Sequence, residues 1–260
     1  MEAYTSFAEV YDAFMDNVPY EEWAEYLIGI LHEYGVNEGI VAELGCGTGA
    51  MTRLLSKAGY DMIGIDNSMD MLDIARMREY ENEDRMCEAS RILYLEQDMR
   101  EFELYGTVAA VVSVCDSMNY ITDPSELLKV MKLADNYLDP GGILIFDFHP
   151  ERYYREELAD QTFAEDRETM SFIWDNLYDP DTQINEFNLS IFVQDPDGRY
   201  SKFQESHYQR GYTISEMHTL IEQSGLNYVA MYDAFTHEPA TDDSERVYVI
   251  ARECTKRPAE

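Results

Sequence analysis

The feature that most constrains this chain is a regular alternation of short apolar runs with amphipathic segments across residues 39–148. The short runs are apolar on both faces, which is typical of parallel strands that helices cover on either side of a sheet. The segments between them carry apolar residues at helical spacing. The expected strands are 39–44, 61–66, 91–98, 108–114 and 141–148, and the expected helices are 49–59, 68–80 and 125–138. The sequence therefore predicts a doubly wound α/β fold.

The pattern changes after residue 150. Longer runs alternate between apolar and polar positions and are joined by turns that contain Pro-Asp, which indicates an antiparallel meander. The expected strands of this meander are 168–179, 182–195 and 198–213. We therefore expect an antiparallel β insertion, residues 151–212, that follows the fifth strand and covers the site of an acceptor molecule.

The two ends of the chain are expected to complete the main domain, which comprises residues 1–150 and 213–260. Apolar and aromatic residues recur at helical spacing in the first 35 residues, and Pro19 divides them into two expected helices. Near the other end, a helix is expected at 215–225 and the last two strands of the sheet at 226–235 and 245–253.

The charge of the chain argues against polyanionic partners. The formal net charge is -33, with 19 lysines and arginines against 52 aspartates and glutamates, whereas binding to phosphate backbones depends on clustered basic residues. DNA, RNA and anionic lipid are therefore unlikely targets, although the acidity can equally serve solubility alone. No apolar run approaches the roughly 20 residues of a membrane span, and the N-terminus lacks the pattern of a signal peptide. We expect a cytoplasmic protein without a membrane segment.

The cysteines and histidines do not predict a metal site. The four cysteines are widely scattered, as are the five histidines, and none of them forms a pair at the spacing of metal ligands. We expect free thiols and no bound metal.

The stretch Val41–Thr52, VAELGCGTGAMT, places three glycines directly after an expected strand and before an expected helix. Glycine allows both a tight turn and a close approach of the backbone to a ligand, and this edge of an open α/β sheet is where nucleotides bind. A dinucleotide fingerprint reads GxGxxG, whereas Gly45, Gly47 and Gly49 read GxGxG. A close crossing between strand and helix is the alternative explanation.

Plausible ligand contacts follow the other strands at the same edge. Asp66 ends the second strand about 20 residues after the glycines, where a carboxylate can accept both hydroxyls of a ribose. Asp98 ends the third strand and can accept an adenine amine, while the backbone of Met99 meets the ring. The fourth strand ends in CDSMNY beside the glycine turn. A strand-end aspartate on the surface is the alternative for Asp66.

Together these residues resemble the class I S-adenosylmethionine-dependent methyltransferases, and more narrowly a group of bacterial members with small or undefined substrates. The resemblance rests on ELGCGTG, GIDNSMDML, QDM, CDSMNY and LDPGGILIFDF. It implies a Rossmann-like seven-stranded sheet whose last strand is antiparallel, with S-adenosylmethionine as cofactor and S-adenosylhomocysteine as product. The implied cofactor-binding residues are Tyr11, Glu43, Gly45, Cys46, Gly47, Gly49, Asp66, Asn67, Ser68, Met69, Gln97, Asp98, Met99, Cys115, Asp116 and Ser117.

Methyl transfer from a sulfonium mainly requires the acceptor to be held in line with the methyl group while water is excluded. Where the acceptor carries a proton, a base is needed, and the candidates are His149, His207 and Tyr120. The expected substrate contacts are Asn119, Tyr120, Trp174, His207 and Arg210. Packing is the alternative role for the histidines and aromatics, and pairing with an acidic neighbour is the alternative for Arg210.

The sequence thus predicts a methyltransferase that acts on an oxygen, nitrogen or carbon of a small molecule. The loop DSMNY departs from the NPPY form that is used on planar amino groups, which argues against adenine in DNA and glutamine in proteins. Three alternatives remain open: an RNA methyltransferase, a non-catalytic protein that binds S-adenosylmethionine, and an NAD-dependent oxidoreductase. The sequence leaves the oligomeric state open.

Overall fold

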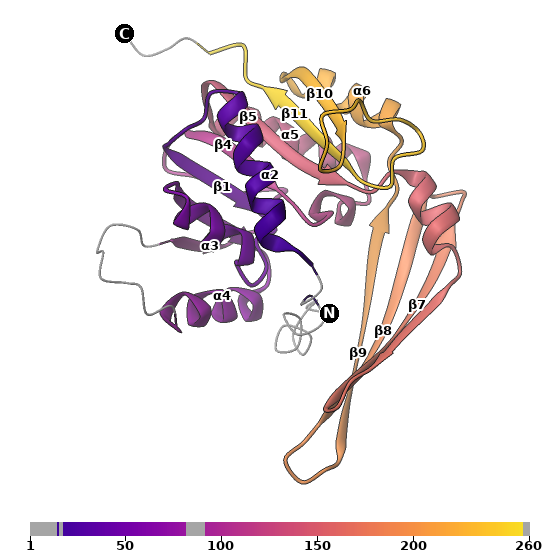
Figure 1. Cartoon of the computed structure of the whole chain (residues 1–260). Coiled ribbons are helices and arrows are strands. Elements are labelled where there is room, and N and C mark those ends of the chain that lie inside the picture. Colours follow the sequence, from indigo (N-terminus) through magenta and orange to yellow (C-terminus); the bar gives the residue numbers. More distant parts are fainter. Residues whose placement is uncertain (1–14, 16–17, 82–91, 257–260) are drawn as a thin grey trace.

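A seven-stranded sheet forms the centre of the computed structural model, which describes residues 15, 18–81 and 92–256 (Figure 1). Its order is β10-β11-β5-β4-β1-β2-β3, and β11 is antiparallel to both of its neighbours while the first five strands are parallel. The strands are β1 (Ile40–Leu44), β2 (Asp61–Asp66), β3 (Leu93–Glu96), β4 (Val108–Ser113), β5 (Leu138–Phe148), β10 (Asn227–Asp233) and β11 (Val247–Arg252). The predicted doubly wound sheet with an antiparallel last strand is confirmed.

Helices cover both faces of this sheet because alternate strand residues point to opposite sides. Val41 packs with α2 and α3 in one core, whereas its neighbour Ala42 packs with α5 and α6 in the other. The helices are α2 (Tyr20–Glu33), α3 (Ala50–Lys57), α4 (Met69–Glu81), α5 (Pro124–Tyr137) and α6 (Ile214–Ser224). No helix in the described ranges is long and apolar enough to cross a membrane.

Local capping fixes where two of these helices begin. Asp123 accepts a hydrogen bond from the backbone N–H of Ser125, and Pro124 occupies the first turn of α5. Thr213 and Glu216 form a reciprocal capping box at the start of α6. The predicted helix before Pro19 falls on residues outside the described ranges.

A second, antiparallel sheet lies in the chain between β5 and α6, in the order β6-β7-β8-β9. Its strands β7 to β9 extend away from the main sheet as a long blade (Figure 1). The strands are β6 (Thr162–Asp166), β7 (Met170–Asp179), β8 (Ile184–Gln194) and β9 (Tyr200–Arg210). The sequence analysis missed β6 and the π-helix η2 (Tyr153–Leu158), which precedes it.

Candidate active site

A cavity of about 560 Å³ lies at the carboxyl ends of the parallel strands and continues to the base of the second sheet. It has two parts that we name by what lines them. The strand-end lobe is lined by the glycine turn and by residues that follow β2, β3 and β4. The aromatic lobe is lined by Tyr120, Tyr153, Leu158, Phe172, Trp174, Phe187, Leu189 and His207.

Most of the residues predicted from the sequence line this cavity. They are Glu43, Gly45, Cys46, Gly47, Asp66, Asn67, Gln97, Asp98, Met99, Cys115, Asp116, Ser117, Tyr120, His149, Trp174 and His207. Five others lie outside the lining: Gly49, Ser68, Met69, Asn119 and Arg210. Tyr11 lies outside the described residues.

The three glycines of the turn have different physical roles. A Cβ at Gly45 would lie 2.7 Å from Ser117 Oγ, and one at Gly49 would lie 2.6 Å from the Tyr94 hydroxyl, so the packing of the protein itself requires glycine at both positions. A Cβ at Gly47 would meet no atom of the described residues within 4 Å, although its φ of +52° favours glycine. Gly47 also lines the cavity, so a side chain there would take up space that a ligand can occupy.

Asp66 holds the glycine turn from the end of β2. Its Oδ2 accepts a hydrogen bond from the backbone N–H of Gly47 at 2.8 Å, and its Oδ1 accepts one from the backbone N–H of Ser68 at 2.9 Å. Burial raises the pKa of the Asp66 carboxyl, and these N–H groups oppose that rise. Each carboxylate oxygen retains a second lone pair, so Asp66 can still accept from a ligand.

Glu43 lies buried at the end of β1 beneath the same turn, where it accepts a hydrogen bond from the Thr52 hydroxyl. Burial raises the pKa of Glu43 to about 8, because the carboxylate has lost most of its hydration. Glu43 therefore carries a proton at neutral pH.

The raised pKa of Glu43 predicts a specific pH dependence of stability. Between its ordinary value of 4.5 and about 8, the folded state holds a proton that the unfolded state has released. The free energy of unfolding should therefore fall as pH rises through this window, by up to about 1.4 kcal/mol for each pH unit. Urea unfolding of Glu43→Gln should lack this decline. Parallel pH profiles for the two proteins would contradict the assignment.

The loop after β3 is closed by its own side chains. Gln97 accepts a hydrogen bond from the backbone N–H of Glu103 at 2.7 Å and donates one to the Glu103 carbonyl at 3.3 Å. Asp98 pairs with Arg100, whose Nε lies 2.9 Å from Oδ1, and this bond holds the pKa of the Asp98 carboxyl below its usual range. Arg100, which the sequence analysis did not single out, lies in the cavity wall beside the expected adenine contact.

The loop after β4 has an unusual backbone. Cys115 and Asp116 are consecutive non-glycine residues with φ of 59° and 53°, a conformation that is rare for residues with a side chain. The backbone N–H of Asp116 donates to Asp147 Oδ1 at 3.0 Å, and the Ser117 hydroxyl donates to the Val114 carbonyl at 2.8 Å. Such strain persists only where the surroundings enforce it, and it is frequent at ligand sites.

A partly buried arginine that was not predicted from the sequence joins this loop to β5. Arg246 donates to Asp147 Oδ2, to Asp116 Oδ1 at 3.0 Å and to His149 Nε2 at 2.7 Å. Its guanidinium also lies 5.0 Å from the centre of the Trp23 ring. Arg246 directly precedes β11 and so meets the end of β5 through the antiparallel register, in which Val247 pairs with Phe148.

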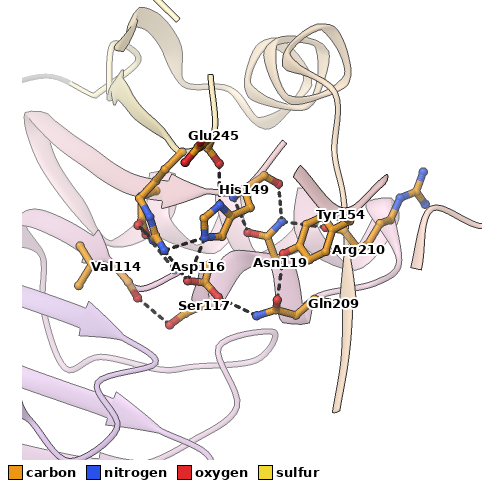
Figure 2. A network of polar contacts seen from close by, with 11 residues as sticks. Val114, Asp116, Ser117, Asn119, His149, Tyr154, Gln209, Arg210 and Glu245 are labelled. Atoms are coloured by element: carbon orange, nitrogen blue, oxygen red, sulfur yellow. Dashed lines mark hydrogen bonds and ion pairs between the residues drawn. The ribbon is translucent and has the colours of Figure 1, made fainter. Parts of the chain in front are cut away.

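His149, a predicted candidate base, lies in the cavity wall and contacts two neighbours through its ring nitrogens. Its Nδ1 lies 2.6 Å from the Glu245 carbonyl, which can only accept, so Nδ1 carries the ring proton (Figure 2). The Nε2 lone pair then faces Arg246. Burial, reinforced by Arg246, lowers the pKa of His149 to about 4. His149 is therefore neutral near pH 7, and both of its ring nitrogens are engaged within the protein.

Asn119 and Arg210, which are predicted to contact substrate, form hydrogen bonds within the protein and lie outside the cavity lining. Asn119 is fully buried, donates to the His149 and Arg210 carbonyls at 2.9 and 2.8 Å, and accepts from the His149 N–H at 3.0 Å (Figure 2). Arg210 donates to Gln183 at 2.8 Å and to Glu216 at 3.2 Å. Arg210 thus has an acidic neighbour on α6, the alternative role that the sequence left open, and lies outside the cavity wall.

The aromatic lobe is built by cross-strand neighbours of the second sheet. Phe187 lies opposite His207, and Trp174 lies opposite Leu189, so these four side chains share one face. His207 Nε2 is 3.1 Å from Glu205 Oε2, and its ring meets the ring of Tyr120 edge to face. His207 and Tyr120 thus lie together in the lobe.

Gln209 connects the second sheet to the strained loop after β4. Its Nε2 donates to Asp116 Oδ2 at 2.8 Å, and its Oε1 accepts from the Tyr154 hydroxyl at 2.9 Å (Figure 2). Since Asp116 also accepts from Arg246, a continuous polar network joins the two lobes of the cavity.

The sequence of this chain is similar to those of known methyltransferases. Residues 41–142 match a family model described as a methyltransferase domain. The chain is 32% identical over 250 residues to the putative methyltransferase YqeM of Bacillus subtilis, with 96% of each chain covered. It is also 24% identical over 224 residues to dTDP-3-amino-3,4,6-trideoxy-alpha-D-glucopyranose N,N-dimethyltransferase of Streptomyces venezuelae, covering 84% of this chain and 89% of that protein.

Solved structures share the fold. An S-adenosylmethionine-dependent methyltransferase from Clostridium acetobutylicum aligns with a TM-score of 0.85 at 24% identity, covering 97% of this chain and 99% of that one. CalS10, an amino pentose methyltransferase solved with S-adenosylmethionine bound, aligns with a TM-score of 0.72 at 18% identity over 94% of this chain and 96% of its own. Together with the relatives of similar sequence, they identify this chain as a member of the class I S-adenosylmethionine-dependent methyltransferase family.

Proposed function

We propose that the protein transfers a methyl group from S-adenosylmethionine to a small molecule held in the aromatic lobe. The observation that carries this proposal is the single cavity in which the strand-end lobe and the aromatic lobe are continuous. Such an arrangement allows a donor in one lobe to face an acceptor in the other. Relatives named as a sugar N,N-dimethyltransferase and as a cypemycin N-terminal methyltransferase support an acceptor other than nucleic acid.

The strand-end lobe fits the cofactor. In the part of the chain that the structure describes, no atom lies within 4 Å of a Cβ built at Gly47, and Asp66 retains capacity to accept hydrogen bonds from ribose hydroxyls. We assign the amino-acid portion of the cofactor to the glycine turn, the ribose to Asp66, and the adenine to Asp98 and the backbone of Met99. The cofactor supplies a methyl group that its sulfonium already activates.

The remaining task of the chain is to orient the acceptor and to exclude water. Aromatic side chains of the second sheet and of the loop after β4 enclose the acceptor, and holding reactants in line can supply an effective molarity of roughly 10^5 M or more. His207 is our candidate to remove a proton from the acceptor where one must leave, with Glu205 beside its Nε2. Tyr120 lies next to His207 and bounds the same space.

The function is tested by incubating the purified protein and labelled S-adenosylmethionine with a metabolite extract, followed by mass spectrometry. We expect a labelled small molecule together with S-adenosylhomocysteine. Label in tRNA or rRNA instead would favour an RNA methyltransferase. Cofactor binding without any labelled product would favour a non-catalytic binding protein.

Asp66→Ala is expected to weaken binding of S-adenosylhomocysteine by about 1–3 kcal/mol, because it removes an acceptor for two neutral hydroxyls. The loss of the bond to the Gly47 N–H contributes to the same effect. Titration calorimetry measures it, and Asp61→Ala at the opposite, exposed end of β2 is the control. Equal affinities for the two variants would remove Asp66 from the site.

A further inference from the structure

The charged groups of the cavity determine what kind of acceptor the aromatic lobe can hold, an inference that rests on the proposed function. Among the described residues of the cavity wall, two carry a guanidinium group, Arg100 and Arg246. Arg100 is paired with Asp98. Arg246 is paired with both Asp116 and Asp147. Each arginine is therefore already neutralised by carboxylates of the protein.

The two histidines of the wall add no free positive charge. His149 is neutral near pH 7, and Arg246 and the Glu245 carbonyl engage its ring nitrogens. A proton on His207 would face the Glu205 carboxylate, 3.1 Å from Nε2. An anionic acceptor group would consequently find no counter-charge in these side chains, and burying an unpaired anion costs several kcal/mol.

The aromatic lobe instead offers ring faces and the indole donor of Trp174. Ring faces attract cations through their quadrupole and pack against apolar bodies. The indole N–H of Trp174 is buried without a hydrogen-bond partner in the described part of the chain, and Phe187 packs edge to face against that ring. Such a donor suits a neutral hydroxyl or carbonyl oxygen of a ligand.

We propose that the acceptor is an uncharged or amine-bearing small molecule with an apolar body, and that the lobe selects against phosphate and carboxylate groups. The Asp66 carboxylate in the same wall, and the two carboxylates that outnumber the single guanidinium of Arg246, add to this selection because they repel an anion. The selection acts on the acceptor itself and is separate from the recognition of the cofactor.

The direct test separates the labelled product of the extract experiment by ion exchange. We expect the label in the unbound or cation-exchange fraction. Label retained on the anion exchanger would overturn the proposed selection while leaving the methyltransferase function intact. If no labelled product forms although S-adenosylhomocysteine binds, the proposed function itself fails, and the inference fails with it.

A second test needs no knowledge of the natural acceptor. The chain holds two tryptophans, Trp23 and Trp174, and both line the cavity. In a Trp23→Phe variant saturated with S-adenosylhomocysteine, fluorescence therefore reports on Trp174 alone. The probes are 2-phenylethylamine, 2-phenylethanol and phenylacetate, which share one body and differ in charge. We expect phenylacetate to bind at least about tenfold more weakly than the other two.

A matched pair of lysine variants tests whether a cation inside the lobe changes the affinity for phenylacetate. Leu189→Lys adds a cation inside the lobe and should raise the affinity for phenylacetate above that of the parent variant. Leu177→Lys, on an exposed position of the same sheet, should leave it unchanged. Phenylacetate binding as tightly as the amine in the parent protein, or failure of all three probes at millimolar concentration, would overturn the proposal.

Discussion

Arg246→Met is expected to lower the free energy of unfolding by about 3–5 kcal/mol, because it leaves the buried carboxylate of Asp147 without its counter-charge. The substitution also removes donors to Asp116 and His149, so the loop after β4 loses part of what holds its unusual backbone. We therefore expect weaker binding of S-adenosylhomocysteine in the fraction that folds. Urea unfolding and calorimetry measure the two effects.

Arg252→Met is the matched control for this substitution. Arg252 ends β11, the strand that Arg246 directly precedes; it lies 5.8 Å from the centre of the Tyr34 ring and donates to the Tyr34 carbonyl at 2.9 Å. It thus shares the packing and cation–π character of Arg246 without pairing to a carboxylate in the described ranges. The Arg252→Met substitution should lower the free energy of unfolding by about 1 kcal/mol. Equal losses for the two variants would contradict a special role for the buried ion pair.

The loss of unfolding free energy that Arg246→Met causes should become smaller at acid pH. Burial already raises the pKa of the Asp147 carboxyl, and removing the guanidinium raises it further. The folded variant then binds a proton at pH values where the unfolded chain has lost it. Its stability, relative to the parent protein, should therefore increase as pH falls toward the ordinary carboxyl pKa.

Gly47→Val is expected to lower the affinity for S-adenosylhomocysteine by at least about 100-fold, or about 2.8 kcal/mol, because the new side chain enters the cavity. The protein should still fold, since a Cβ at this position meets no atom within 4 Å among residues 15, 18–81 and 92–256. Because the backbone at residue 47 is left-handed, valine there should lower the free energy of unfolding by about 1–3 kcal/mol.

Gly59→Val provides the control, because Gly59 also has a positive φ and open space around its Cβ but lies outside the cavity wall. It should lose a comparable amount of stability while keeping its affinity for S-adenosylhomocysteine. If Gly47→Val binds as well as Gly59→Val, the ligand does not approach the turn closely.

The main sheet was predictable because its signal is local. Residues such as Val41 and Ala42 face opposite helical layers, so a buried parallel strand is apolar throughout and can be recognised from its own letters. The strand β6 was missed because TFAED is polar and mostly exposed, and η2 was missed because a single π-helical turn has no hydrophobic repeat.

Within the site, only the residues at the carboxyl ends of the parallel strands could be predicted from the sequence. Asp66 ends β2 and Asp116 follows β4, two parallel strands on either side of β1 whose carboxyl ends share one edge of the sheet. Arg246 meets Asp116 across 130 positions of the chain, and Gln209 meets it across 93. These contacts depend on the register of β11 and on how the second sheet joins the first. Tertiary contacts of the same kind engage Asn119 and Arg210 within the protein.

The central claim is that the cavity at the ends of the parallel strands holds the adenosyl cofactor. Titration calorimetry of the purified protein with S-adenosylhomocysteine tests it most directly, with NAD titrated in parallel. We expect saturable binding of S-adenosylhomocysteine at one site for each chain and no comparable binding of NAD. The absence of measurable binding by S-adenosylhomocysteine, or preferential binding of NAD, would contradict it.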